Sequence, residues 1–583
     1  MIQETVGLDL LVDRVSAAIR LDRWMSRLVD GSSEDLRSPY YRKFSRKEVV
    51  GRFIQELKGQ LEGSDSSLKT LIFTNLEIPQ SEKIGPQSAA KPWDEWGPEL
   101  VKELYRDTSF PGKLNGRALK RSVERVQSLL PLNSIGMTST ATAIGNRVDG
   151  SVESMEHEGM DGTTNSGLPW IIGHWKPGLD ERDPEKLEAF RWLVKERVPA
   201  VNEELSRGEI VKFAAVASTR MTQKGEGGPS MRLVDALDKA EPIMWKRFTP
   251  ELLSKLRECG QFVALDDIPF IDLTMQSILD KASESGRTIL SGDYSHYDQS
   301  LPSGLIELAG TIIANWVRGG RTFVNALVSS MVTSAMVSPS GIVPWRRGGM
   351  RSGSGGTNLL DSICNLIVIM YGEEAGFWKV EQAAVQGDDF ILDGEGVSPE
   401  AIAEVSTLFG LTAHPDKQYF ASDSLMFLQR LHIRGKLGGI ASTTRTLGSI
   451  LSYERLVLRP NKWDSEVADT IRARAQLQNA WANPFFEILV KFVSKGDRFK
   501  LGGSATMREL LKRAGDSAEA IIRSSLSGQA EIQGGRIDTS SLDAAVIGVL
   551  SGKRIPEWGT KSRFEWAYGD RATAARAIEQ RKM

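Results

Sequence analysis

The sequence predicts an α+β protein built from several lobes. At 583 residues and 64.3 kDa the chain exceeds what one hydrophobic core usually holds, and about one domain per 100–200 residues gives three or four lobes. Apolar residues recur at helical spacing near both ends, whereas short runs rich in strand formers lie between residues 211 and 392. With 25% charged and 40% hydrophobic residues, the composition is globular rather than disordered or fibrous.

Charge and cysteine content exclude several classes of protein. The 73 Lys and Arg residues nearly balance the 75 Asp and Glu residues, so a site for a polyanion must be a local basic channel. Cys259 and Cys364 lie far apart without metal-ligand spacing, which predicts neither a disulfide framework nor a zinc site. No apolar run approaches the roughly 20 residues of a membrane span, and the amino terminus lacks the pattern of a signal peptide. We therefore expect no membrane contact and an intracellular or particle-borne protein.

Residues 1–130 are expected to form a largely helical N-terminal extension. Apolar positions repeat at helical spacing within residues 8–28 and 49–61, which predicts amphipathic helices with packing roles. Prolines and a glycine within residues 79–92 indicate a connector. No internal repeat or low-complexity tract is evident.

Two segments in the next part of the chain have the composition of anion-binding loops. Residues 161–170 (DGTTNSGLPW) offer hydroxyl, amide and backbone N–H groups to phosphate, although a plain loop is the commoner use of such a sequence. Residues 211–216 predict a strand, which is followed by cations and glycines up to Arg232. These residues could line a channel for a triphosphate and a template backbone, and a solvated charged loop is an equally good interpretation. Residues 240–248 predict the start of a helix, with Pro242 early in it.

An apolar strand at residues 287–292 ends on an acid. Asp293 thus lies at the carboxyl end of a buried strand, a common place for ligand sites. Asp298 follows past the turn and can reach the same pocket. A single strand-end Asp is more often structural, so this assignment depends on a second acidic element.

A glycine-rich loop at residues 348–356 opens a long helix that runs through residue 370. Helical spacing places Thr357, Asp361 and either Cys364 or Asn365 on one face. The loop lacks the Gly-Lys-Ser/Thr of a P-loop and does not fit the dinucleotide fingerprint.

Residues 383–392 (AAVQGDDFIL) predict a β-hairpin with Asp388 and Asp389 at its turn. Adjacent carboxylates flanked by buried strands repel each other, so a divalent cation is their natural counter-charge. The alternative is an ordinary exposed turn, because Gly-Asp is common turn chemistry.

In this order and at this spacing, the three acidic and glycine-rich segments resemble motifs A, B and C of viral RNA-dependent RNA polymerases. The motifs are Asp293 with Asp298, the Ser-Gly-x-x-x-Thr of residues 352–357, and the Gly-Asp-Asp of residues 387–389. The details are most similar to polymerases of double-stranded-RNA viruses of the partitivirus and picobirnavirus type. The resemblance covers roughly residues 160–435.

The resemblance implies a right-hand polymerase fold with fingers, palm and thumb. Its expected parts are the N-terminal extension (1–130) bridging fingers and thumb, fingers (131–280), a palm with an inserted fingers segment (281–440), and a thumb with a C-terminal tail (441–583). The C-terminal aromatic residues could support a first nucleotide by stacking, but core packing is their more common use. They are Trp558, Phe564, Trp566 and Tyr568.

The resemblance also implies roles for individual residues. Two Mg²⁺ ions, with Mn²⁺ as an alternative, are expected on Asp293, Asp388 and Asp389. Lys417 of a motif D-like segment is expected to protonate the leaving pyrophosphate, with an ordinary salt bridge as the alternative role. The expected nucleotide-binding residues are Arg220, Lys224, Arg232, Asp298, Ser352, Gly353, Thr357, Asp361 and Asn365. The expected template and primer residues are Thr164, Asn165, Ser166 and Gly167 of motif G, and Phe427, Leu428, Gln429 and Arg430 of motif E.

One position departs from the family pattern. Four residues after the motif B Thr the family commonly has Asn, whereas this chain has Asp361. That Asn ordinarily helps the counterpart of Asp298 to sense the ribose 2′-hydroxyl. The remaining candidates for ribose discrimination are then Asp298 and either Ser352 or Thr357.

The expected activity is RNA-directed RNA synthesis on a viral template, with replication and transcription of a double-stranded RNA genome and initiation without a primer. The implied partners are template and product RNA, ribonucleoside triphosphates and viral capsid protein, in the virion interior and the host cytoplasm. Two alternatives stay open: a reverse transcriptase or other palm polymerase, and a non-catalytic RNA-binding virion protein on a palm scaffold.

Overall fold

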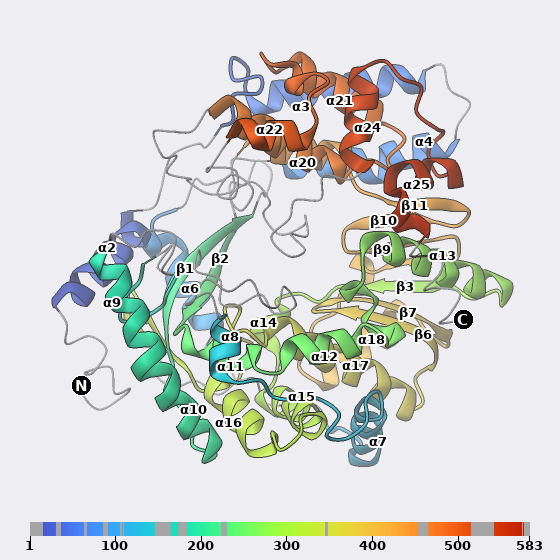
Figure 1. Ribbon diagram of the computed structural model, residues 1–583. Coiled ribbons are helices and arrows are strands. Elements are labelled where there is room, and N and C mark those ends of the chain that lie inside the picture. Colours follow the sequence, from blue (N-terminus) through green and yellow to red (C-terminus); the bar gives the residue numbers. More distant parts are fainter. Residues whose placement is uncertain are drawn as a thin grey trace.

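The computed structural model describes residues 15–30, 37–62, 67–84, 91–104, 108, 110–145, 165–172, 183–222, 230–343, 348–452, 465–514, 541–573 and 575. Within these residues, helices surround two four-stranded sheets and one three-stranded sheet, so the α+β prediction is confirmed. Figure 1 shows the sheet of β1 and β2 at the left, the sheet of β3, β6 and β7 at the lower right, and the helices of the C-terminal region above. None of the described helices is long and apolar enough to cross a bilayer.

The palm sheet has the order β6-β7-β3-β8, with every pair antiparallel. Its strands are β3 (Ile289–Gly292), β6 (Lys379–Gln386), β7 (Asp389–Glu395) and β8 (Tyr419–Ala421). Because successive side chains of a strand point to opposite faces, Leu290 and Leu392 join one hydrophobic core and Ile289 and Ile391 join another. The sheet is therefore buried on both faces.

The first core lies between the palm sheet and a group of helices. These helices include α7 (Gly116–Gln127), α15 (Ser303–Trp316), α16 (Arg321–Val332) and α17 (Thr357–Glu374). The expected helix after the glycine-rich loop is α17, and it begins at Thr357 as predicted. Although α7 falls within the expected N-terminal extension, it packs on α17, and the Tyr371 hydroxyl of α17 accepts a hydrogen bond from Asn115 N at 2.9 Å.

The fingers sheet has the order β2-β1-β4-β5. Its strands are β1 (Ala214–Thr222), β2 (Ser230–Leu237), β4 (Ala335–Ser338) and β5 (Gly341–Val343). Strand β1 begins three residues later than the run at 211–216 predicts, and β4 and β5 supply the fingers segment expected inside the palm sequence. The predicted helix near Pro242 is α11 (Ala240–Lys246).

The N-terminal helices contact both the fingers and the C-terminal helices. Helix α2 (Val15–Asp30) lies on the fingers sheet, where Trp24 Nε1 donates to Ala217 O at 2.8 Å. Helix α3 (Arg46–Leu61) packs instead on α19 (Thr443–Leu451) and α21 (Phe486–Lys495) of the thumb region. The N-terminal helices thus contact the fingers through α2 and the thumb region through α3, as a bridge between the two would. The connector predicted at 79–92 was wrong for its first part, because the chain remains helical through α5 (Ile78–Lys83), and Pro79 follows a π-helical turn (Phe73–Glu77).

Glu77 fastens this N-terminal segment to the thumb region. Its fully buried carboxylate accepts hydrogen bonds from Ser442 Oγ at 2.8 Å, Thr443 N at 3.0 Å, Thr444 N at 2.9 Å and Thr444 Oγ1 at 2.7 Å. Asn483 Nδ2 donates a further bond at 2.7 Å. The carboxylate therefore satisfies the free backbone donors at the start of α19, where a negative charge is also favoured by the helix dipole.

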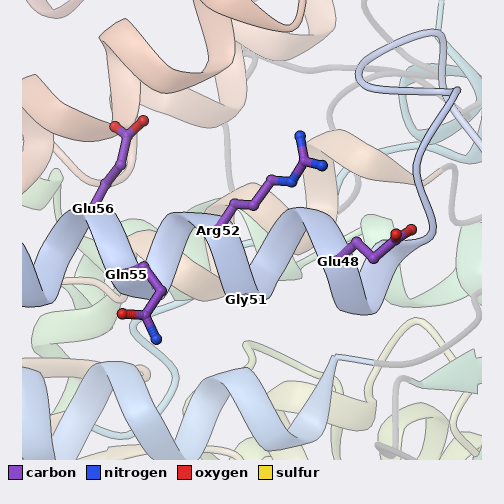
Figure 2. A pocket seen from close by; sticks show the side chains of 5 residues that line it. All are labelled: Glu48, Gly51, Arg52, Gln55 and Glu56. Atoms are coloured by element: carbon purple, nitrogen blue, oxygen red, sulfur yellow. The ribbon is translucent and has the colours of Figure 1, made fainter.

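An open surface hollow runs along α3. Figure 2 shows the side chains of Glu48, Arg52, Gln55 and Glu56 projecting from this one helix, with Gly51 between them. All its lining residues belong to α3, and it does not include the palm carboxylates.

Two of the four C-terminal aromatic residues are buried in a hydrophobic core. Phe564 and Tyr568 of α25 (Lys561–Tyr568) are buried in the second core with Trp481. The Tyr568 hydroxyl accepts from Trp481 Nε1 and donates to the buried Asp272, both at 3.0 Å. Core packing is thus the role of these two rings.

Candidate active site

The palm sheet brings the two acidic segments together. Strands β3 and β7 end their pairing at Gly292 opposite Phe390, so Asp293 and Asp389 are the next residues along each strand. Asp388 lies in the turn of the β6–β7 hairpin beside Gly387, whose φ of 61° suits glycine. Gly292 is also required here, because a Cβ atom would stand 1.9 Å from the Phe390 ring. The predicted hairpin and the predicted meeting of Asp293 with Asp388 and Asp389 are confirmed.

The three carboxyl groups repel one another in a partly desolvated site. Burial, and then Asp388, raise the pKa of Asp293. Burial, and then Asp388 and Asp293, raise the pKa of Asp389 to about 7. Burial raises the pKa of Asp388, and the positive charge of Arg232 opposes part of this rise. The site therefore has an excess of negative charge that a divalent cation would offset.

The donor set fits a hard cation such as Mg²⁺. Carboxylate oxygens are its preferred protein ligands, and it retains waters and substrate phosphates in its shell, so few side chains are needed. Among the described residues, no group of three or more Asp, Glu, His or Cys side chains has the arrangement of a metal site. Asp293, Asp388 and Asp389 are the residues that would hold it.

Helix α17 supports the acidic turn from behind. Gly387 N donates to Ser362 Oγ at 2.8 Å, and Asn365 Nδ2 donates to Gly387 O at 3.0 Å and to Asp388 O at 3.4 Å. Asn365 is fully buried, and its Oδ1 accepts from the Tyr294 hydroxyl at 3.3 Å. The expectation that Asn365 binds nucleotide was therefore wrong: both polar atoms of its amide are used to position the turn.

The glycine-rich loop before α17 packs closely on the fingers. A Cβ atom at Gly353 would lie 1.7 Å from Asp235 O at the end of β2, so only glycine fits there. The Thr357 hydroxyl donates to Arg351 O at 2.5 Å and to Ser354 O at 3.1 Å, so its observed role is to shape the loop. Ser352 is exposed and remains a candidate for nucleotide contact.

Glu241 of α11 anchors this loop and was missed in the sequence. Its buried carboxylate accepts from Ser354 Oγ, from Gly355 N at 3.1 Å and from Trp245 Nε1 at 2.8 Å. Burial raises its pKa to about 7. A lone Glu early in a helix carries no sequence signal for this role, which depends on a loop more than a hundred positions away.

Two described cations face the carboxylates. Arg232 of β2 opposes the rise in pKa of Asp293, Asp298 and Asp388. Lys417, exposed in a short 3-10 helix (Pro415–Lys417), also acts on Asp293. Arg220 pairs with Arg232 in the strand register, but its side chain and the whole of Lys224 lie outside the described residues.

Gln418 holds Asp293 by its backbone and was also missed. Its Oε1 accepts from Asp293 N at 3.1 Å, while its Nε2 donates to Asp293 O at 3.0 Å and to His414 O at 3.0 Å. Ser295 N donates to Thr412 O at 2.9 Å in the same pair of segments. The segment that carries Lys417 is thus fixed against the catalytic strand end.

We expect Gln418→Ala to lower kcat for nucleotide incorporation about ten- to a hundredfold with little change in KM, because a shift of about 1 Å in Asp293 spoils the reacting geometry. Single-turnover and steady-state kinetics on one template measure both parameters. The matched control is Gln55→Ala on the exposed face of α3 (Figure 2). Equal kinetics for the two variants would contradict a positioning role for Gln418.

The expected template loop is described only in part. Thr164 lies outside the described residues. Asn165 Oδ1 accepts from Gly167 N at 2.8 Å, and the buried Ser166 hydroxyl accepts from Ile172 N at 3.1 Å. Gly167, with φ of 72°, lies against the end of β2. These side chains shape the loop, and their contact with RNA stays a prediction.

The expected primer grip is a hairpin of β9 (Ser424–Phe427) and β10 (Arg430–Ile433). Phe427 is buried in the second core, and Arg430 pairs with the buried Asp272 at 3.5 Å, so both side chains support the hairpin from inside. Their contact with the primer stays a prediction. Leu428 and Gln429, with φ of 51° and 60°, form the tip and remain candidates for primer contact. A motif fixes position along the chain but does not fix side-chain direction.

Comparison with known proteins agrees with this geometry. Residues 271–461 match the family described as viral RNA-dependent RNA polymerase. The chain is 22% identical over 498 residues to a potential RNA-dependent RNA polymerase of a human picobirnavirus, covering 83% of this chain and 86% of that protein.

Two solved structures share the fold. The crystal structure of the RNA-dependent RNA polymerase of a human picobirnavirus aligns with a TM-score of 0.68 and 17% identity, covering 98% of each chain. The insertion-loop deletion mutant of a human picobirnavirus polymerase aligns with a TM-score of 0.70 and 18% identity, covering 92% of this chain and 98% of that one. The right-hand polymerase fold is therefore confirmed.

Proposed function

Because this chain belongs to the viral RNA-dependent RNA polymerases, we propose that it copies a viral RNA template by two-metal nucleotidyl transfer. The observation that supports this most directly is the meeting of Asp293, Asp388 and Asp389 at one end of the palm sheet. Their mutual repulsion and their oxygen ligands suit divalent cations.

In the proposed reaction the primer 3′-oxygen attacks the α-phosphorus of the incoming nucleotide. The new O3′–Pα bond forms as the bond from Pα to the pyrophosphate oxygen breaks, and the 3′-hydroxyl passes its proton to solvent water. Two bound Mg²⁺ ions would supply Lewis-acid stabilisation of the attacking and departing oxygens.

The residues of the site have separate roles in this step. Asp293 and Asp388 would hold the cations, and Asp389 would assist at the metal or primer end. Arg232, together with Arg220 and Lys224, neutralises the triphosphate by charge-assisted hydrogen bonds. Lys417 donates a proton to the departing pyrophosphate.

Similarity to picobirnavirus polymerases supports a wider proposal. The chain replicates and transcribes a double-stranded RNA genome without a primer, in the virion interior and the host cytoplasm, with capsid protein as a partner. Since Phe564 and Tyr568 are buried, a stacking platform for the first nucleotide would have to use other residues.

The decisive assay is incorporation of labelled nucleotide by the purified chain on a homopolymer RNA template. We expect ribonucleotide incorporation with Mg²⁺ or Mn²⁺ and none in EDTA. Preferential use of deoxyribonucleotides would instead favour a reverse transcriptase. Absence of incorporation with either substrate and either ion would favour a non-catalytic RNA-binding protein.

The raised carboxyl pKa values predict a pH-dependent effect of the metal on stability. Asp389 in the folded protein holds its proton up to a pKa of about 7, against about 3.9 when unfolded, so without metal its contribution to stability falls as pH rises from about 4 through 7. A cation requires the ionised form. We expect Mg²⁺ to raise the melting temperature more at pH 8 than at pH 5.5 in scanning fluorimetry, and Asp389→Asn to reduce this difference. An equal Mg²⁺ effect at both pH values would contradict the assignment.

A further inference from the structure

We propose that the C-terminal helix α25 sets how firmly the tip of the β9–β10 hairpin holds the 3′ end of the growing RNA strand, through a buried link formed by Tyr568 and Asp272. Both are positioning residues in this proposal, and Leu428 and Gln429 of the tip make the contact with RNA. The inference rests on the proposed polymerase function for its RNA ligand. Helix α25 lies outside residues 271–461, which match the polymerase family, so the family match does not assign it this role.

The tip of the hairpin has a backbone conformation that its own residues disfavour. Leu428 and Gln429 have φ of 51° and 60°, in the left-handed region that two-residue hairpin turns require and that glycine and asparagine usually occupy. Other residues persist there where the surrounding structure holds them. Leu428 packs against the second core, whereas Gln429 is exposed. The shape of the tip therefore depends on how its two flanking strands are anchored.

Arg430, the first residue after the tip, is anchored at a buried acid. Its guanidinium donates to Gly439 O at 3.2 Å and 3.0 Å, and it pairs with Asp272 Oδ1 at 3.5 Å. Gly439 belongs to β11 (Lys436–Ile440), and its backbone N donates to the same Oδ1 at 3.0 Å. Asp272 belongs to α13 (Ile268–Glu284) and has no exposed surface. One carboxylate thus joins the strand that follows the tip to the next strand of the sheet.

Helix α25 holds the other oxygen of this carboxylate. The Tyr568 hydroxyl donates to Asp272 Oδ2 at 3.0 Å. Just before α25, the backbone makes a second contact with the sheet, since Leu437 N of β11 donates to Gly559 O at 3.0 Å. Figure 1 shows α25 beside β10 and β11. The C-terminal segment is therefore connected to the tip through one buried acid and two paired strands.

The Tyr568 hydroxyl can be removed without removing the ring. Its ring packs edge-on against Trp481 and Phe564, with centroids 4.9 Å and 5.0 Å away, and a Phe ring would keep these contacts. A buried carboxylate oxygen would then lack its donor, which weakens the hold of Asp272 on Arg430. Asp293 is held separately, by Gln418, so the effect falls on the hold on RNA rather than on the chemical step.

Binding of a labelled RNA primer–template without nucleotide tests the link by fluorescence anisotropy. We expect Tyr568→Phe to weaken the affinity about three- to tenfold, the size of one lost buried hydrogen bond. The matched control is Tyr40→Phe, which removes a buried hydroxyl of the same core that donates to Asp469 O at 3.4 Å. An equal effect of the two substitutions, or an unchanged affinity of Tyr568→Phe, would overturn the proposal.

A double-mutant cycle tests whether Tyr568 acts through the tip. In a variant that carries both Leu428→Ala and Gln429→Ala, we expect Tyr568→Phe to weaken RNA binding by no more than about twofold further, because the contact that it supports is already lost. General weakening of the core would instead multiply with the effect of the tip variant. That result would overturn the proposal.

Primer extension with an excess of unlabelled RNA as a trap separates the hold on RNA from the chemistry. We expect Tyr568→Phe to shorten the products about threefold or more through faster dissociation, with kcat for single addition in preformed complexes within about twofold of wild type. Equal losses in both would overturn the proposal. A wild type that binds RNA but adds no nucleotide would refute the polymerase function, whereas weaker RNA binding by Tyr568→Phe would still support the link. A wild type that binds no RNA would refute both.

Discussion

Asp388→Asn is expected to abolish RNA synthesis while the protein remains folded. In the proposed reaction the substitution removes a carboxylate that would bind the metal, and loss of several kcal/mol of transition-state stabilisation corresponds to about a thousandfold in rate or more. The turn itself should persist, because Ser362 and Asn365 hold it through backbone atoms of Gly387 and Asp388. Incorporation assays measure the loss, and the melting temperature reports the fold.

A control substitution shows whether a loss of activity comes from the palm site or from the removal of any negative charge. Asp280→Asn removes one exposed carboxylate from α13, away from the palm carboxylates, and is expected to leave incorporation unchanged. Activity of Asp388→Asn comparable to that of the control would refute the metal assignment. A lowered melting temperature in Asp388→Asn would instead indicate that the turn needs the side chain.

Glu77→Ala is expected to produce the largest loss of stability of any single substitution considered for this chain. It leaves buried donors of Ser442, Thr443, Thr444 and Asn483 without their acceptor. At about 1–3 kcal/mol for each unsatisfied buried group, the loss should reach several kcal/mol even after local rearrangement. Thermal or denaturant unfolding, followed by intrinsic Trp fluorescence, measures it.

The control for Glu77 is another Glu on the same side of the molecule. Glu56 of α3 pairs with Lys495 of α21 at 3.2 Å, and both side chains are exposed. Because exposed ion pairs contribute only about 0–1 kcal/mol, Glu56→Ala should hardly move the transition. Equal effects of the two substitutions would show that the five hydrogen bonds of Glu77 are dispensable.

The sequence was most informative where residue type and position alone determine the chemistry. The strand ending at Asp293, the helix beginning at Thr357 and the hairpin at Asp388 were all predicted, because hydrophobic periodicity and turn residues determine them locally. Their meeting at one site could be predicted only from the resemblance to a known family.

The support of the site could not be predicted in the same way. Gln418 and Glu241 are single polar residues whose contacts with the site, to Asp293 and to Ser354, span more than a hundred positions, so no local pattern indicates them. Asn365, Phe427 and Arg430 stood in recognised motifs, yet their side chains face the interior, because packing rather than motif position decides direction. Asp361 shows the reverse case: its departure from the family pattern was visible in the sequence, whereas its burial is visible only in the structure.

The hydrogen bond between Glu77 and Ser442 also determines when the N-terminal segment can dock on the thumb region during synthesis of the chain. The two residues are separated by 365 positions, and Asn483 emerges from the ribosome later still. Until then the Glu77 carboxylate in the N-terminal segment lacks its hydrogen-bond donors. A nascent chain that ends within the palm would contain Asp293, Asp388 and Asp389 but could not form the contact between its N-terminal segment and the thumb region.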